Sequence, residues 1–84
     1  MSKIATEYYG RKFGNDIVKT YVHVVREIGE LARALETNNL DLAKLEITET
    51  AALLYFLAEK YGFDLNQNIE AVYKKKLESQ KATS

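Results

Sequence analysis

The sequence predicts an all-α fold, a helical bundle of about four helices with two long central ones, in a single domain that spans residues 1–84. The chain has no Pro and only four Gly residues, so it offers few places where a helix must stop. Apolar residues recur at steps of three and four, as on one face of a helix, and no useful stretch alternates as a strand would. Together these observations indicate helices connected by short breaks.

The first half of the chain predicts a short helix followed by a long one. The short helix covers about residues 3–9 and is expected to end at Gly10, before a basic loop that runs to Gly14. Asn15 or Asp16 is suited to cap a second helix that lasts to about Glu36. Its apolar residues form a stripe that predicts a buried face: Ile17, Tyr21, Val24, Ile28, Leu31 and Leu35.

The second half predicts another long helix and a final amphipathic one. Residues 37–39 interrupt the helical pattern, and Asp41 is suited to cap a third helix that lasts to about Tyr61, with Gly62 just beyond its end. Asp64 or Asn66 is suited to begin the last helix, and the polar tail over residues 79–84 is expected to fray. The last helix carries four apolar positions: Ile69, Val72, Tyr73 and Leu77.

The third predicted helix also predicts self-association. Residues 51–58 read AALLYFLA and are apolar around the whole helix, whereas a helix on the surface of a monomer has a polar face. A helical chain of 84 residues has too little other material to surround this segment. We therefore expect a homo-oligomer, either a dimer or a tetramer built as a dimer of dimers, associated through this region.

Composition excludes several classes of function. The 12 basic and 12 acidic residues balance, which argues against nucleic acid as a general partner. The absence of Cys excludes disulfides, thiolate metal sites and a cysteine nucleophile. No apolar run approaches membrane-spanning length, and the N-terminus lacks the apolar core of a signal peptide, so we expect a cytoplasmic protein without a membrane partner.

Two Glu-x-x-Glu pairs, Glu27/Glu30 and Glu46/Glu49, are the best indication of function. About two such pairs arise by chance in a chain this acidic, so the argument depends on their position in the two most apolar helical stretches. Residues three apart lie on neighbouring faces of a helix, so two antiparallel helices can bring all four carboxylates together. Four hard oxygen donors suit Mg²⁺ or Mn²⁺. The alternative is that these are ordinary glutamates on helix flanks.

Other candidate residues each have a structural alternative. Aromatic residues near the N-terminus, Tyr9 among them, alternate with Arg11 and Lys12 and suit base stacking and phosphate pairing, or they hold the first segment to the bundle. Lys75, within a run of three lysines, suits phosphate binding across a subunit interface, or the run is a solvated helix end. His23 lies one turn before Glu27. It suits a role as a ligand or a proton carrier, or it is a structural residue.

The order and spacing of four segments resemble a known family. The segments are residues 27–31 (EIGEL), 38–41 (NNLD), 46–49 (EITE) and 61–65 (YGFDL), and 15 residues separate the two acid pairs. They look like the MazG-like branch of the all-α nucleoside triphosphate pyrophosphohydrolases, whose pattern is Glu-x-x-Glu, a spacer and Glu-x-x-Asp. The resemblance covers most of the chain, from about Tyr8 to Leu77.

This resemblance implies a Mg²⁺-dependent enzyme that cleaves a nucleoside triphosphate, (d)NTP, to the monophosphate and pyrophosphate, for example to remove non-standard nucleotides. It implies that Glu27, Glu30, Glu46 and Glu49 are metal ligands and catalytic residues, and that Lys75 corresponds to a common Lys. Glu49 departs from the usual Asp, and Ser79 from a common Asn. The alternative hypothesis is a non-catalytic helical module that keeps the fold and binds itself or a partner.

Overall fold

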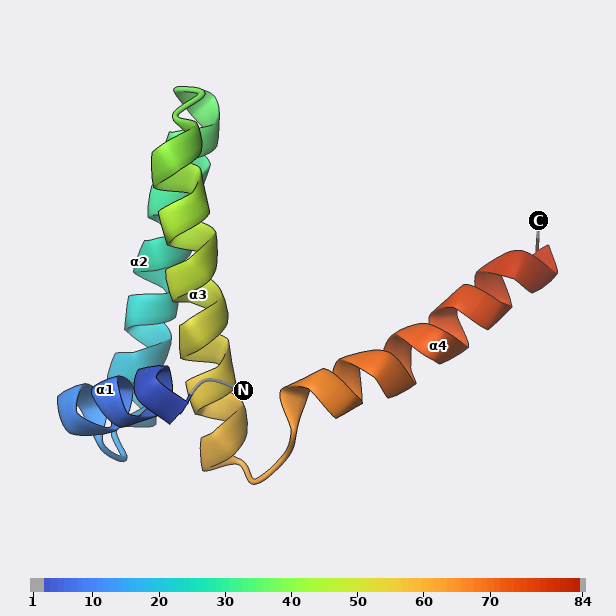
Figure 1. The fold of residues 1–84 in the computed structure, drawn as a ribbon, viewed down its shortest axis with the longest axis horizontal. Helices are drawn as coiled ribbons and strands as arrows, with labels where there is room; N and C mark the ends of the chain where they lie inside the picture. The colour runs from blue at the N-terminus through green and yellow to red at the C-terminus, as the bar shows by residue number, and fades with distance from the viewer. Residues whose placement is uncertain (1–2, 84) are drawn as a thin grey trace.

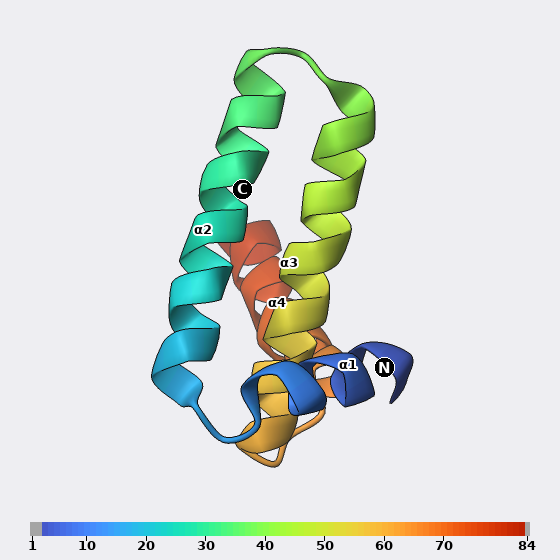
Figure 2. The same ribbon diagram turned by 90° about the vertical axis from the view of Figure 1, so that its left-hand side faces the viewer.

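The protein is described here by a computed structural model that covers residues 3–83. Its four helices are α1 (Lys3–Phe13), α2 (Ile17–Glu36), α3 (Leu40–Lys60) and α4 (Leu65–Thr83). Figures 1 and 2 show α2 and α3 as a long antiparallel hairpin, with α1 across one end of it and α4 projecting away. No strand occurs between residues 3 and 83, so the all-α prediction is confirmed.

The first helix is longer than predicted. Gly10 lies inside α1, which continues to Phe13, and the chain turns at Gly14, whose φ of +56° suits glycine. A glycine within a helix costs only about 1 kcal/mol. The ring of Tyr9, which precedes Gly10, stacks on the ring of Phe13 one turn later, at a centroid distance of 5.8 Å, and both are buried. This packing explains why the helix passes through Gly10.

The N-terminal caps of the two long helices are side chains next to the helix start. Asp16 caps α2 and accepts a hydrogen bond from the backbone N–H of Lys19 at 2.9 Å. Asn39 caps α3 and accepts from the N–H of Leu42 at 3.1 Å. The prediction that Asp41 is the α3 cap is wrong, because Asn39 is the cap and the helix begins at Leu40, one residue before Asp41. Asp41 lies in the first turn, where its negative charge interacts favourably with the helix dipole.

The turn between α3 and α4 is closed by hydrogen bonds. Gly62 follows α3 with a φ of +75°, as predicted for a glycine beyond a helix end, and the N–H of Phe63 donates to the Ala58 carbonyl at 3.2 Å. Asp64 caps α4. The helix runs to Thr83, through most of the tail over residues 79–84 that was expected to fray; Ser84 lies outside the described residues.

The buried core lies where α1 crosses the α2–α3 hairpin. It consists of five apolar side chains with Ala52 and Leu57 packed against them: Tyr9, Phe13, Val24, Leu53 and Phe56. α2 and α3 contact each other extensively and α1 contacts both, and Figure 1 shows no helix packed along α4. None of the helices between residues 3 and 83 has the length and apolar content needed to span a membrane.

The buried face of α2 is narrower than predicted. The side chains that it buries are Thr20, Val24, Glu27 and Ala34. Tyr21, Ile28 and Leu35, predicted to be buried, are each at least half exposed. Apolar residues occupy two sides of α2, and α3 packs against only one of these sides.

Candidate metal centre

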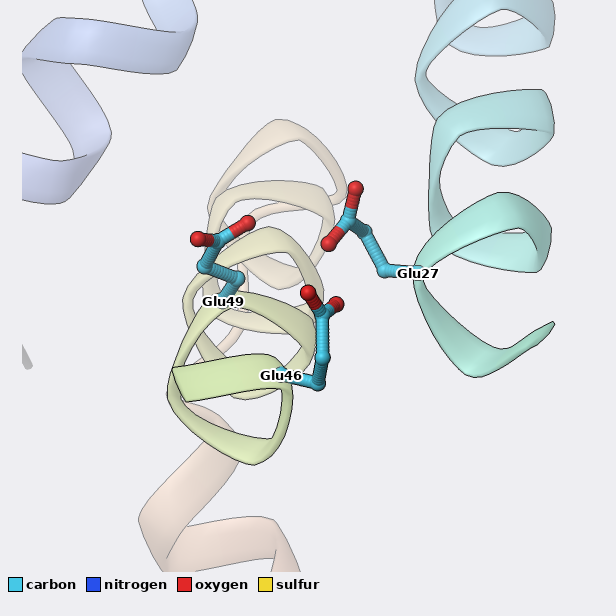
Figure 3. A group of neighbouring side chains, drawn as sticks. All are labelled: Glu27, Glu46 and Glu49. Atoms are coloured by element: carbon cyan, nitrogen blue, oxygen red, sulfur yellow. The ribbon is translucent and has the colours of Figure 1, made fainter. Parts of the chain in front are cut away.

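Three of the predicted glutamates converge between the two long helices. Glu27 of α2 and Glu46 of α3 are buried, with exposed fractions of 8 % and 6 %, and Glu49 of α3 is half-buried. One carboxylate oxygen from each of these residues lies within 4.8 Å of the others. Figure 3 shows Glu27 reaching from α2 toward the two glutamates of α3. This group is called the acid cluster below.

Helical spacing explains why these charged residues are buried. Glu27 follows Val24 by three residues, and Glu46 follows Ala43 by three, so each lies one turn from a buried residue on the same face. These are the faces through which α2 and α3 pack. Burying a charge without a partner costs several kcal/mol, so apolar residues would have been the expected occupants of both positions.

Two polar atoms near the acid cluster lack a hydrogen-bond partner among residues 3–83. Glu46 Oε2 is buried and accepts no hydrogen bond, and the same is true of Thr50 Oγ1, which lies one turn further along α3. Buried polar atoms are satisfied in most proteins by a protein group, a water or an ion. A buried carboxylate oxygen with a free lone pair next to two further carboxylates fits a cation that binds hard oxygen donors.

The charges of the acid cluster destabilise one another. The pKa of Glu27 is raised, first by the neighbouring Glu46 carboxyl, with which a protonated Glu27 can form a hydrogen bond, and second by burial. Burial is the largest cause of the raised pKa of Glu49, followed by its interaction with Glu27. Without a cation, the acid cluster therefore favours retaining a proton, which is the behaviour expected of carboxylates that share a small volume.

Several side chains surround the acid cluster. His23 Nε2 lies 3.5 Å from Glu27 Oε1, and His23 Nδ1 lies 3.3 Å from Arg26 Nη2. The Phe13 ring lies 5.3 Å from the imidazole, between centroids. The positive charge of Lys12 lowers the pKa of Glu49, against the larger effects that raise it. The acid cluster thus has a lysine of α1 and the imidazole of α2 beside it.

The other predicted site residues lie at varying positions. Glu30 is half-buried on α2 and is not a member of the acid cluster. Tyr9 belongs to the core, and burial and then the charge of Glu49 raise its pKa. Arg11 is exposed and pairs with Glu7 at 3.3 Å. Lys75 is exposed on α4, which projects away from the hairpin that carries the acid cluster.

Thr50 is the residue of this region that the sequence analysis missed. It follows Glu46 by four residues, so helical spacing alone places the two on one face of α3. A threonine in an apolar helix usually donates to the carbonyl four residues earlier, as Thr48 does to Lys44. The absence of this bond at Thr50 is visible only in the three-dimensional structure.

The donor set of the acid cluster is chemically selective. Three carboxylates, with neither a sulfur nor a histidine nitrogen among the grouped donor atoms, suit Mg²⁺ or Mn²⁺ better than Zn²⁺ or copper. No family model matches this chain, and no curated protein or solved structure matches it. The geometry of the acid cluster and the spacing of the motifs therefore carry the functional argument.

Proposed function

We propose that this protein is a Mg²⁺-dependent nucleoside triphosphate pyrophosphohydrolase that acts in the cytoplasm as a homo-oligomer. Its products would be the nucleoside monophosphate and pyrophosphate. The observation that supports this proposal most is the acid cluster, in which the buried Glu46 Oε2 has no hydrogen-bond partner in the described part of the chain. The two acid pairs in the order and spacing of MazG-like proteins give the reaction class.

The residues of the acid cluster supply the metal ligands in this proposal. Glu27, Glu46 and Glu49 would hold one or more Mg²⁺ ions, with Glu30 one turn further along α2. Bound Mg²⁺ lowers the pKa of a water and offsets negative charge on the phosphates and on the departing pyrophosphate. His23 would hold the Glu27 carboxylate in position through the contact between Nε2 and Oε1.

The cationic groups near the acid cluster suit the substrate. Lys12 is close enough for its charge to affect Glu49, and Arg11 is the preceding residue on the exposed last turn of α1. A triphosphate carries several negative charges, and basic side chains at the edge of a metal site attract it and orient it. Lys75 would contribute to the same task from another copy.

The reaction is tested by incubating the protein with a panel of nucleoside triphosphates and Mg²⁺ and separating the products by ion-exchange chromatography. We expect monophosphate and intact pyrophosphate, and a rate at least about 10²-fold lower in Glu46→Gln. Glu70→Gln, a change of the same chemistry on exposed α4, is the matched control and should keep the rate. Release of orthophosphate and a diphosphate, or equal rates in both variants, would contradict the proposal.

A non-catalytic assembly module is the alternative function. The observation in its favour is the amount of apolar surface that the chain leaves uncovered on α2 and α4. In that case the acid cluster would serve only local structure. The two functions differ in their response to the panel of triphosphates, because a module turns over none of them even when Mg²⁺ binds.

A further inference from the structure

The chain exposes far more surface than a compact protein of its size. Its accessible area is 6580 Å², whereas a compact monomer of this mass exposes about 5,100 Å². Its radius of gyration is 15.3 Å, against about 12 Å for a compact domain of this length. The excess area, about 1,500 Å² per chain, exceeds the roughly 800 Å² that each partner buries in a typical stable interface.

Part of the excess is an apolar stripe along α2. The side chains of this stripe are at least half exposed and recur at steps of three, four and seven: Val18, Tyr21, Val22, Val25, Ile28 and Leu35. His23 lies on the flank of α2 that faces α1, because it contacts Phe13 of that helix. Val25 follows two residues later, about 200° around the helix. The stripe therefore lies on the side of α2 away from α1.

A second stripe along α3 faces the same way. Phe56 marks the flank of α3 that faces α1, because its ring lies 6.0 Å from that of Tyr9, between centroids. Leu54 precedes it by two residues and lies about 200° away, and Ala51 and Ile47 lie one and two turns before Leu54 on the same face. All three are exposed. The two stripes form one continuous apolar surface, called the open face below, on the side of the hairpin that α1 leaves uncovered.

The last helix projects from the side of the open face. Figure 2 shows α1 in front of the hairpin and α4 behind it, and Figure 1 shows the same opposition in profile. Every described side chain from Asn66 to Ala82 is exposed. Among them Ile69, Val72, Tyr73 and Leu77 form an apolar face at steps of one, three and four. α4 has 19 residues and is therefore about 28 Å long.

We infer that a second copy of this chain covers the open face, and that each α4 crosses over to pack on its partner's hairpin. A two-fold axis pairs one surface with itself, so a single self-complementary apolar face is enough for a closed dimer. α4 has 19 residues, against 20 in α2 and 21 in α3, so it is long enough to pass along nearly the whole partner hairpin. In the same contact, the apolar face of the exchanged α4 becomes buried against the partner hairpin.

The turn before α4 favours exchange over folding back. Backbone N–H groups of residues 61–63 donate to carbonyls of the last turn of α3, and Asp64 caps α4. The Tyr55 hydroxyl also donates to Asn66 Oδ1, at 2.5 Å, which ties the first turn of α4 to α3. Folding α4 back onto its own hairpin would have to break the contact between Tyr55 and Asn66, whereas α4 can reach a second copy in its present direction.

The dimer is tested by sedimentation equilibrium of the full-length chain from 1 to 100 μM. We expect twice the chain mass of 9.6 kDa, and a dissociation constant at least about tenfold weaker in Val25→Glu and in Val72→Glu. Lys19→Glu on the polar flank of α2 and Ala71→Glu on the polar flank of α4 are the matched controls and should change it less than threefold. A monomeric mass for the unaltered chain at 100 μM would overturn the inference.

The exchange of α4 is tested by cross-linking, for which the absence of native Cys is convenient. One chain carries Val25→Cys, another carries Val72→Cys, and the two are mixed and treated with a bis-maleimide. Exchange predicts a product of twice the chain mass that contains one chain of each kind, identified by mass spectrometry. If the doubly substituted chain links these two positions only within itself, α4 folds back and the exchange is refuted, even in a variant that sediments as a dimer.

This inference does not depend on the proposed chemistry. The open face lies opposite the flank of α2 that carries His23, which contacts the acid cluster. Loss of activity without loss of the dimer would count against the enzyme alone. A monomer that still releases pyrophosphate would count against the dimer, and against the homo-oligomeric state in the proposed function, but not against the reaction.

Discussion

Replacing Glu46 by Gln is expected to stabilise the metal-free protein and to abolish its stabilisation by Mg²⁺. Glu46 is the most buried member of the acid cluster, and its Oε2 has no hydrogen-bond partner among the residues that the structure describes. Gln has nearly the same shape but no charge, so the substitution removes electrostatic repulsion and leaves the packing of the hairpin intact. It also removes an anionic ligand, which weakens the binding of a divalent cation.

The size of the effect follows from the geometry of the acid cluster. Two unit charges 4.8 Å apart repel by about 3.5 kcal/mol at an effective dielectric constant of about 20. Three carboxylates form three such pairs, and the substitution removes two of them. Proton retention by Glu27, whose pKa is raised, relieves part of this repulsion, so the expected gain is about 1–3 kcal/mol. For a chain of this length that gain raises the Tm by roughly 5–15 °C.

The assay is thermal unfolding followed by circular dichroism at pH 7.5, with EDTA or with increasing MgCl₂. The unaltered chain should gain about 2.7 kcal/mol when Mg²⁺ reaches 100 times its Kd, and Glu46→Gln should show no gain beyond that of equal ionic strength in NaCl. Glu70→Gln should behave like the unaltered chain. A lower Tm for Glu46→Gln in EDTA, or an undiminished response to Mg²⁺, would refute the reasoning.

Three further outcomes are expected. Leu53→Ala should lower the free energy of unfolding by about 2–5 kcal/mol, measured by urea denaturation, because Leu53 is fully buried, whereas the half-exposed Leu45→Ala should cost much less. Asn39→Ala should cost about 1 kcal/mol in the same measurement through loss of the α3 cap, and an unchanged urea midpoint would show that the cap is dispensable. The pKa values of Glu27 and Glu49 are raised above 4.5 in the folded state, so the folded metal-free protein binds more protons than the unfolded chain. The contribution of these two carboxyl groups to the free energy of unfolding is therefore largest below pH 4.5 and falls as pH rises through their folded pKa values. Between pH 4.5 and 7.5, the urea midpoint should therefore fall less steeply in Glu27→Gln than in the unaltered chain.

The helices were predictable because the signals that define them are local. The central pair, the break at residues 37–39 and the glycine after α3 all follow from apolar periodicity, capping residues and backbone conformation within a few positions of one another. The errors were local as well. Gly10 was taken as a helix end because the sequence alone does not reveal that the rings of Tyr9 and Phe13, one turn apart, stack on each other.

The membership of the acid cluster was predictable only in part. Spacing alone brought the two Glu-x-x-Glu pairs to facing helices, and three of the four residues meet. Which face of α2 turns toward α3 depends on how the whole hairpin packs, and helical periodicity does not determine that rotation. Glu27 lies on the packed face, whereas Glu30, three residues later, lies about 60° away from it around the helix.

The apolar faces of α2 explain both the missed core residues and the open face. A sequence analysis that looks for one buried face assigns Tyr21, Ile28 and Leu35 to the core of the single chain, although each is at least half exposed there. The residues that pack against α3 instead include Thr20 and Glu27, which are polar. The hairpin thus holds its carboxylates where a single-chain core would place leucines, and it keeps much of its apolar surface on the outside. That distribution suits a chain whose helices are held together by a cation between them and by a second copy across the open face, since neither a small core of five side chains nor the acid cluster alone would stabilise so long a hairpin.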